Sequence, residues 1–198
     1  NDLSILKKLN VDFVYLPKKK DIYNYKRKSQ IKIKINDRIL CAKFRKGHFE
    51  GVLDVMERLT KIIRPQKIYM GEKDFQQLFL VRKHIHNRFK SKIISCKTVR
   101  DKNKLALSSR NLLLNKTDLF KAGKIAKNLI FFKKKLTKYK NYKTFLLNKK
   151  KELINLYNIK IDYLELRNIS NLKNSVKLRN SKLFFAYYMN GVRLIDNY

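Results

Sequence analysis

Two short segments of this sequence carry the side chains best suited to bind and neutralise phosphate. Lys73 lies in the segment Gly71-Glu72-Lys73-Asp74-Phe75-Gln76-Gln77, and Arg110 ends the run Leu107-Ser108-Ser109-Arg110. A lysine supplies a compact positive charge, an arginine supplies a planar fork of N–H donors, and serine hydroxyls donate to phosphate oxygens. These residue types indicate a site for a phosphorylated substrate.

The first segment is predicted to lie at a strand-to-helix junction, because it follows the apolar run at 68–70 and opens a helical pattern. Open α/β sheets bind ligands at such junctions, where a helix N-terminus offers unpaired N–H groups and a positive dipole end. Gly71 is expected to permit a tight turn. Gln77 follows Lys73 by four residues on the same helix face, so a polar substrate can bind beside the phosphate.

Each segment also has a purely structural interpretation. Acidic residues are common at ordinary helix starts, so the segment 71–77 does not identify a ligand site by itself. Serines are common helix caps, and a cap is the favoured interpretation of Ser108 and Ser109 taken alone. The occurrence of both segments in one chain favours the phosphate site.

Taken together and in this order, the motifs resemble the pantothenate synthetase (pantoate–β-alanine ligase) family. The segment 71–77 is the most specific of them, and the resemblance covers nearly the whole chain. The other matching segments are Gly47-His48-Phe49-Glu50-Gly51-Val52, Leu105 to Asn111, Asp162 to Arg167, Arg193 to Asn197, and the opening Val11 to Val14 with Pro17 and Tyr23.

The resemblance implies an ATP-dependent condensation of pantoate with β-alanine. Pantoate is first converted to pantoyl adenylate with release of pyrophosphate, and the β-alanine amine then displaces AMP to give pantothenate. Mg²⁺ is expected to bridge the phosphates of ATP, with no metal ligand assigned to the chain. The resemblance also implies a cytoplasmic homodimer that binds neither nucleic acid nor membrane.

Particular residues receive roles from the same resemblance. Lys73 and Arg110 would be catalytic, because they would neutralise charge in the transition state. Gln77 would bind pantoate, and His48 would form a wall of the active site without an assigned role. The expected ATP-binding residues are Gly71, Glu72, Lys73, Asp74, Val99 through its backbone to adenine, Leu107, Ser108, Ser109 and Arg110.

The sequence departs from the family pattern in one respect. The family begins with a His-x-Gly-His motif for ATP and an Asn-Pro-x-Gln-Phe segment for pantoate, and neither motif occurs here. The chain also starts at Asn1 rather than Met. We therefore expect a fragment that lacks the first part of its nucleotide-binding domain and is inactive on its own.

The hydrophobic pattern predicts an α/β chain in two parts. The resemblance places the boundary near Val99 and implies that residues 1–98 form a Rossmann-like, parallel-sheet nucleotide-binding domain that is incomplete at its N-terminus. Residues 99–198 are then expected to form a smaller α+β domain carrying the Ser-Ser-Arg loop. The expected strands are 11–16, 31–35, 67–70, 92–99, 160–167, 183–189 and 192–196, and the expected helices are 5–9, 49–63, 75–89, one capped by Thr117, and 142–157.

The formal net charge of +34 over 198 residues raises the alternative of an RNA-binding adenylating module related to class I aminoacyl-tRNA synthetases. A non-catalytic remnant is a third possibility. However, Gly occurs 5 times, Pro 2 times and Trp not at all, while Lys, Asn, Ile, Tyr and Phe are abundant. This bias toward A/T-rich codons explains the charge without a basic groove, and the lysine runs at 133–135 and 149–151 are interpreted as solvated helix faces.

Several other side chains are expected to be structural. His84 and His86 are predicted to lie on the surface. Cys41 and Cys96 are interpreted as buried thiols in a reducing compartment, and they have no metal-type spacing. No signal peptide is visible, and no apolar run approaches the length of a membrane span.

Overall fold

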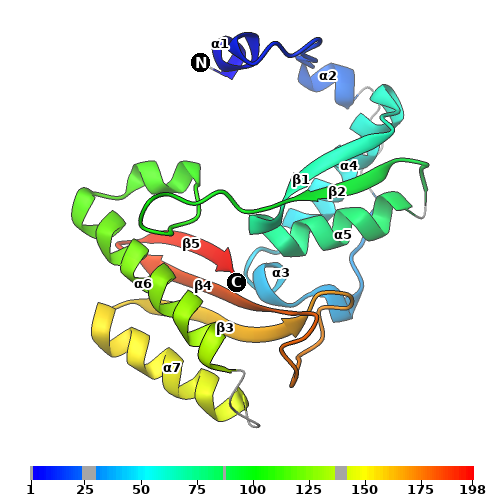
Figure 1. The fold of residues 1–198 in the computed structure, drawn as a ribbon. Helices are drawn as coiled ribbons and strands as arrows, with labels where there is room; N and C mark the ends of the chain where they lie inside the picture. The colour runs from blue at the N-terminus through cyan, green and yellow to red at the C-terminus, as the bar shows by residue number, and fades with distance from the viewer. Residues whose placement is uncertain (1, 24–29, 87, 137–141) are drawn as a thin grey trace.

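Two β-sheets and the helices around them organise the chain (Figure 1). The computed structural model describes residues 2–23, 30–86, 88–136 and 142–198. The helices and 3-10 turns are α1 (Asp2–Lys8), α2 (Lys19–Ile22), η1 (Ile35–Asp37), α3 (Leu40–Phe44), α4 (His48–Ile63), η2 (Glu72–Asp74), α5 (Phe75–His86), η3 (Ser109–Leu113), α6 (Lys116–Lys135) and α7 (Tyr142–Tyr157). The strands are β1 (Lys67–Gly71), β2 (Lys92–Cys96), β3 (Lys160–Asn168), β4 (Ser181–Met189) and β5 (Val192–Asn197).

The first sheet confirms the predicted parallel pairing. Strands β1 and β2 run parallel, with Gly71 opposite Cys96 at their carboxyl ends, and α5 connects them as the crossover helix. The predicted inward face of α5 is buried at Phe75, Leu78, Val81 and Ile85. The junction between β1 and α5 therefore lies at the edge where open α/β sheets bind ligands.

The second sheet is antiparallel, in the order β3-β4-β5. Its strands match the three predicted ranges closely, and the turn between β4 and β5 falls at Asn190-Gly191, where both residues have positive φ angles of 45° and 77°. That conformation is typical of the Asn-Gly hairpin turn. Helix α7 spans the predicted 142–157, and α6 and α7 lie side by side on one face of the sheet (Figure 1).

Strand β4 is buried on both faces. Leu183, Phe185 and Tyr187 pack in one hydrophobic cluster with residues of α6 and α7. Phe184 and Ala186, which point to the other face, pack in a second cluster with residues of α3, α4 and α5. The C-terminal sheet thus carries the N-terminal helices on its free face, and this contact fixes the two motif segments relative to each other.

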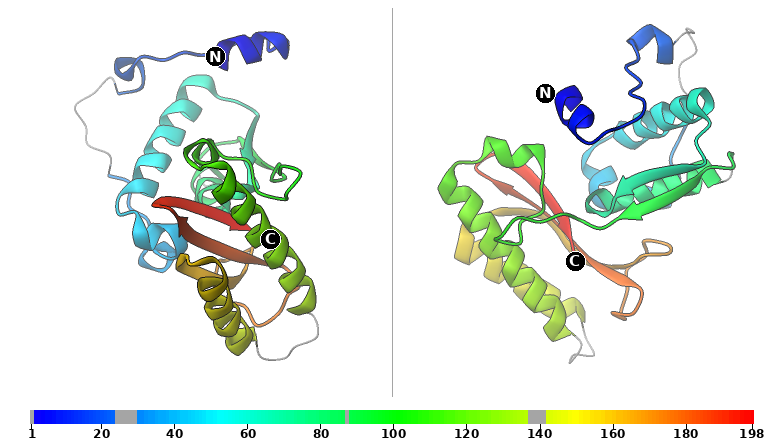
Figure 2. Two further views of the ribbon diagram at one scale, coloured as in Figure 1. Left: turned by 90° about the vertical axis from the view of Figure 1, so that its left-hand side faces the viewer. Right: turned by 45° about the horizontal axis from the view of Figure 1, so that its top comes forward.

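The helix expected at 5–9 is present as α1, but the strand expected at 11–16 is absent. Residues 11–16 form no strand and are exposed, with Phe13 92% exposed. Helix α1 has no buried residue and stands apart from both sheets in all views (Figures 1 and 2). An apolar run becomes a buried strand only where a neighbouring strand and a packed face accept it, and the described residues provide neither here.

The predicted strand at 31–35 is also absent. Ile33 is buried, but the segment pairs with no strand among the described residues, and Ile35 begins the turn η1. Between the two expected strands the chain forms helix α2, and residues 24–29 lie outside the described residues.

Two helix details differ from the sequence prediction. Helix α6 is capped by Asn115, whose Oδ1 accepts from the backbone N of Asp118 at 2.8 Å, so Thr117 lies inside the helix. The spacing of Phe49, Val52, Met56, Leu59 and Ile63 predicts one buried helix face. In α4, however, Phe49 and Leu53 are buried while Ile63 is 53% exposed. Across the described ranges, no helix is long and apolar enough to cross a membrane.

Candidate functional site

The segment Gly71–Gln77 forms the predicted junction, with one difference at its first residue. Gly71 ends β1, Lys73 lies in the turn η2, and Gln77 lies in the first turn of α5. Gly71 has ordinary extended angles, φ −69° and ψ 134°, and a Cβ placed there would meet nothing within 4 Å. The turn therefore does not require glycine, contrary to the expectation from the sequence.

The structure brings Lys73 and the Ser-Ser-Arg loop to one cavity of about 190 Å³. We call it the phosphate cavity. Lys73 and Asp74 line one side from η2, while Ser108, Ser109 and Arg110 line another. These residues lie more than thirty positions apart in the sequence, and both segments reach the cavity beside the end of β5. The tertiary fold thus assembles the pair of cations that the sequence predicted separately.

Two further arginines line the phosphate cavity and were not assigned a role from the sequence. They are Arg45, which follows α3, and Arg193 on β5. The only signal for Arg193 was its presence in the matching segment 193–197, and Arg45 had no signal beyond its place near His48. Four cationic side chains surrounding a small cavity favour a polyanionic ligand.

Arg193 positions Arg110 through its backbone. Arg110 Nη1 donates to the carbonyl oxygen of Arg193 at 2.7 Å, and the backbone N of Arg110 donates to Ser108 Oγ at 3.3 Å. The Arg193 side chain is 11% exposed and donates from Nε to Asp162 Oδ2 at 2.8 Å. Burial lowers the pKa of Arg193, but the interactions with Asp162, Cys41 and Tyr163 together outweigh burial and raise the pKa above the usual value. The guanidinium is therefore a fixed positive charge.

A smaller hollow of about 30 Å³ adjoins the phosphate cavity and shares Lys73 and Asp74 with it. Gln77 and His48 line this hollow, so both lie beside Lys73 as the sequence predicted. Burial and the positive charges of Arg45 and Arg110 lower the pKa of His48, outweighing the opposite effect of Asp74. A neutral imidazole is therefore favoured at this wall.

Gln76 has a structural role that the sequence did not reveal. Its side chain is buried, and its Nε2 donates to the carbonyl oxygens of Asp37 at 3.0 Å and Ile39 at 2.8 Å. Its Oε1 accepts from the backbone N of Ala42 at 3.3 Å. Both glutamines line the hollow, but the side-chain amide of Gln76 is bonded to the segment leading into α3.

Other predicted ATP-binding residues lie outside the phosphate cavity. The carboxylate of Glu72 pairs with Lys182 Nζ at 3.0 Å, and Glu72 does not line the cavity. The carbonyl oxygen of Val99 accepts from the backbone N of Leu107 at 2.9 Å, and the two residues are 67% and 53% exposed. Val99 and Leu107 therefore form a paired, exposed stretch of the connection between the two sheets.

Two predictions about isolated side chains are wrong. His84 is 9% exposed rather than on the surface, because its Nε2 bonds to Glu57 Oε2 at 2.7 Å across α4 and α5. Burial raises the pKa of Glu57, but hydrogen bonds from Lys61 and His84 outweigh burial and lower it. Cys96 is exposed at the end of β2, while Cys41 is buried as predicted. His86 is exposed, as predicted.

The lysine runs are only partly solvated. Lys149 has a side chain 10% exposed, with its Nζ 5.3 Å from the centre of the Phe132 ring. Burial and the nearby charge of Lys182 lower the pKa of Lys133. Long aliphatic stems allow lysines to cover apolar surface while the ammonium group stays near water.

Comparisons with known proteins agree with the family resemblance of the motifs. A sequence model of the family described as pantoate-beta-alanine ligase matches residues 1–198. A pantothenate synthetase of Clostridium botulinum is 35% identical over 203 residues, covering 100% of this chain and 71% of the relative. One from Francisella tularensis subsp. novicida is 37% identical over 199 residues, covering 100% and 68%.

Solved structures show the same fold. The crystal structure of pantothenate synthetase from Thermus thermophilus is similar with a TM-score of 0.90 and 27% identity, covering 100% of this chain and 72% of that chain. A pantoate-beta-alanine ligase from Francisella tularensis, complexed with beta-gamma ATP and beta-alanine, has a TM-score of 0.76 and 33% identity, covering 100% and 68%. The chain belongs to the pantoate–β-alanine ligase family.

Proposed function

We propose that this chain takes part in the ATP-dependent condensation of pantoate with β-alanine, through pantoyl adenylate. Family membership supports the reaction, and the observation that carries it in this structure is the phosphate cavity, which joins Lys73 to the loop at Ser108–Arg110. The complex of the Francisella tularensis relative with ATP and β-alanine supports the same substrates.

In the first step a pantoate carboxylate oxygen attacks the α-phosphorus of ATP, and the bond to pyrophosphate breaks. Two anions must approach each other, so the protein has to place them and neutralise their charge. Lys73 and Arg110 supply positive charge at the phosphate cavity, and the hydroxyls of Ser108 and Ser109 donate to phosphate oxygens. Leu107 to Arg110 would close over the phosphates as one loop.

In the second step the β-alanine amine attacks the activated carbonyl carbon, the bond to AMP breaks, and the amine loses a proton. Gln77 would hold pantoate by hydrogen bonds from the hollow beside Lys73. A neutral His48 at the wall of this hollow adds no charge that would compete for the pantoate carboxylate. Gln77 would thus offer pantoate an uncharged amide, in a hollow that Arg45 and Lys73 also line.

The nucleotide would lie along the carboxyl ends of β1 and β2. The turn from Gly71 to Asp74 would line it through the backbone, and Val99 would meet adenine through its N–H and not its carbonyl, which is already bonded. Mg²⁺ would neutralise phosphate charge. The described part of the chain holds no group of three or more His, Cys, Asp or Glu residues that could bind a metal, so the phosphates of ATP would supply most ligands, with Asp74 as a nearby carboxylate.

We extend the proposal to the organisation of the molecule. A domain boundary near residues 98 and 99 is supported by the change from a parallel to an antiparallel sheet across this connection. A homodimer is proposed from the family resemblance, and analytical ultracentrifugation would test it. A cytoplasmic location is proposed because the relatives are enzymes of small-molecule biosynthesis.

The test of the function is a coupled pair of assays on the protein expressed with any sequence that precedes Asn1 in its reading frame. Pyrophosphate release must require both ATP and pantoate, and AMP release with formation of pantothenate must also require β-alanine. L-Lactate in place of pantoate serves as the control for non-specific carboxylate activation. Release of pyrophosphate from ATP at the same rate with and without pantoate would refute the proposal.

A further inference from the structure

Asn197, at the end of β5, bonds directly to the turn that carries Lys73. Its side chain is 3% exposed, and its Nδ2 donates to the carbonyl oxygens of Glu72 at 2.7 Å and Lys73 at 3.0 Å. These contacts join residues more than one hundred positions apart. The turn η2 is a single 3-10 turn, a conformation with weak internal hydrogen bonds, so such an external bond contributes strongly to its geometry.

Asn197 is itself held in place by the preceding residue and by Arg100. Arg100 donates to both carboxylate oxygens of Asp196, at 2.7 Å and 2.8 Å, and to the carbonyl oxygen of Asn197 at 3.1 Å. The backbone N of Asn197 donates to Asp196 Oδ1 at 2.7 Å. Burial lowers the pKa of Arg100, but Asp196 outweighs it and raises the pKa above the usual value. The ion pair is therefore a permanent support.

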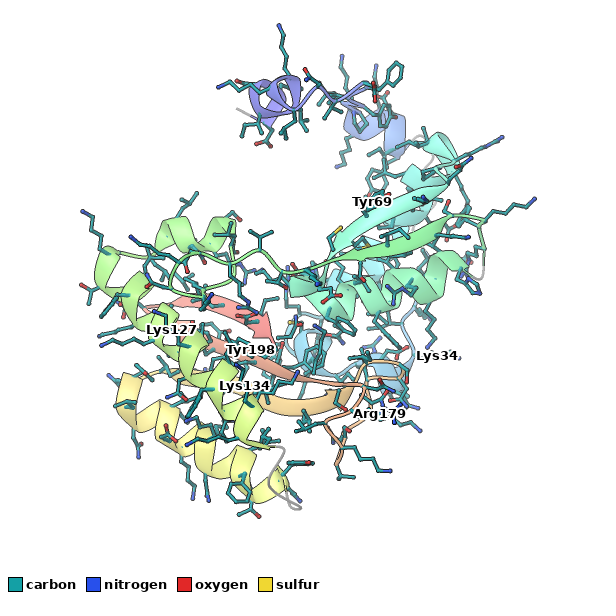
Figure 3. The ribbon with its side chains drawn as sticks, in the orientation of Figure 1. Lys34, Tyr69, Lys127, Lys134, Arg179 and Tyr198 are labelled. Atoms are coloured by element: carbon teal, nitrogen blue, oxygen red, sulfur yellow. The ribbon has the colours of Figure 1, made fainter. Side chains whose placement is uncertain are left out.

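The last residue completes this support. The guanidinium of Arg100 lies 5.0 Å from the centre of the Tyr198 ring, and Figure 3 shows Tyr198 where the C-terminal sheet meets α6. Tyr198 also lines the phosphate cavity. We call Arg100, Asp196 and Asn197 the clamp: Asp196 lines the phosphate cavity, while Arg100 and Asn197 lie outside its lining and hold the end of β5.

One strand consequently fixes both predicted catalytic cations. At its start β5 presents the carbonyl of Arg193 to Arg110 at 2.7 Å, and at its end it presents the amide of Asn197 to the backbone of Lys73. Asn197 Oδ1 is buried without a hydrogen-bond partner among the described residues. A buried acceptor without a partner destabilises the folded state, and an apolar residue at this position would not have that cost. The two hydrogen bonds donated by Nδ2 are therefore the contribution that the Asn197 side chain makes.

We infer that Asn197 is a positioning residue, which sets the distance between Lys73 and Arg110 by clamping the turn η2 to strand β5. The inference rests on the proposed function, because it concerns how the phosphate cavity holds a polyphosphate. Asn197 acts through Lys73 and is not itself expected to touch the substrate.

The probe is inorganic pyrophosphate, the product that the phosphate cavity would release, with binding followed by calorimetry. Asn197→Leu keeps the branched shape and removes the donors without adding charge. Misplacement of a group by about 1 Å can lower a reaction rate on the order of 10²-fold. For the binding of pyrophosphate alone, we expect the affinity to fall at least tenfold. Asn168→Ala is the control, because Asn168 also ends a strand and its side chain bonds to Ser170 in its own turn rather than to the turn η2.

A double-mutant cycle separates positioning from general loss of structure. If Asn197 acts through Lys73, Asn197→Leu should weaken pyrophosphate binding no further in a Lys73→Ala background. Equal weakening in both backgrounds, or unchanged affinity in the single variant, would overturn the inference. Should Asn197→Leu fail to fold, Asn197→Ser is subjected to the same criterion.

Failure of the proposed function gives a different result. In that case the unsubstituted protein would show no pantoate-dependent release of pyrophosphate. Calorimetry of the Asn197 and Lys73 variants would still test the inference, because it measures only the binding of pyrophosphate. Hydrogen exchange adds a readout independent of ligand: Asn197→Leu should speed exchange at residues 72–77 and leave the helix α7 unchanged. Uniform acceleration over the whole chain would show a merely structural role and overturn the inference.

Discussion

Replacing Lys73 by alanine removes a positive charge from the phosphate cavity without disturbing the core. The Lys73 side chain is 18% exposed, and its Nζ lies 3.6 Å from a carboxylate oxygen of Asp74, which is 51% exposed. Partly exposed pairs of this kind contribute about 0–1 kcal/mol to stability. We therefore expect Lys73→Ala to unfold within a few degrees of the unsubstituted protein.

The effect on adenylation should be much larger. Two unit charges about 4 Å apart interact with roughly 4 kcal/mol at an effective dielectric constant near 20, but only the part that grows in the transition state accelerates the reaction. Loss of one such group typically costs about 10²–10³-fold in rate. Three arginines remain around the cavity, at 45, 110 and 193, so we expect a loss near the lower end, about 10²-fold.

The assay is the initial rate of pyrophosphate release with saturating ATP and pantoate. Lys83→Ala is the matched control. Lys83 lies in α5, pairs with Asp37 at 3.3 Å, is 44% exposed and does not line the phosphate cavity. Its rate should equal that of the unsubstituted protein. A rate for Lys73→Ala within fivefold of the control would refute the catalytic role of Lys73.

The same geometry supports three further predictions. Gln77→Ala should weaken pantoate binding about tenfold or more and leave ATP binding unchanged, as measured by calorimetry with each ligand; the reverse result would mean that the two ligands have been exchanged in our assignment. Because the pKa of His48 lies below 6.5 in the folded state, the unfolded chain binds a proton first as the pH falls, so stability present above pH 6.5 should decline below it. Chemical denaturation of His48→Gln should show a shallower decline, and an unchanged pH dependence would contradict the shift. The chain of 198 residues alone should form no AMP that depends on both pantoate and β-alanine, because it has no His-x-Gly-His motif; clear turnover would show that this motif is dispensable.

Much of the fold could be predicted from local pattern. The α5 face, the α7 range and the hairpin at Asn190-Gly191 follow from spacing and turn chemistry that act within a few residues. The run at 11–16 has the same apolar pattern as a buried strand but is exposed. Pattern specifies which residues prefer burial, while a strand also needs a partner that the pattern does not name.

The candidate site shows the same division. Residue types alone predicted that Lys73 and Arg110 could bind phosphate, because charge and donor geometry belong to the side chain. The roles of Gln76 and Asn197 were not predictable, since each bonds to backbone carbonyls of a distant segment. An amide in a sequence gives no indication of whether it only lines a hollow, as Gln77 does, or holds a turn of the chain, as Gln76 does.

The sequence by itself determined the chemistry available and most of the helices and strands, because these depend on side-chain type and on contacts between near neighbours. Only the tertiary structure decided where that chemistry acts. It placed β4 between two hydrophobic clusters, and so brought the turn of Lys73 and the loop of Arg110 to the two ends of β5. Distances between remote segments depend on how whole layers pack, and no local pattern in the chain records them.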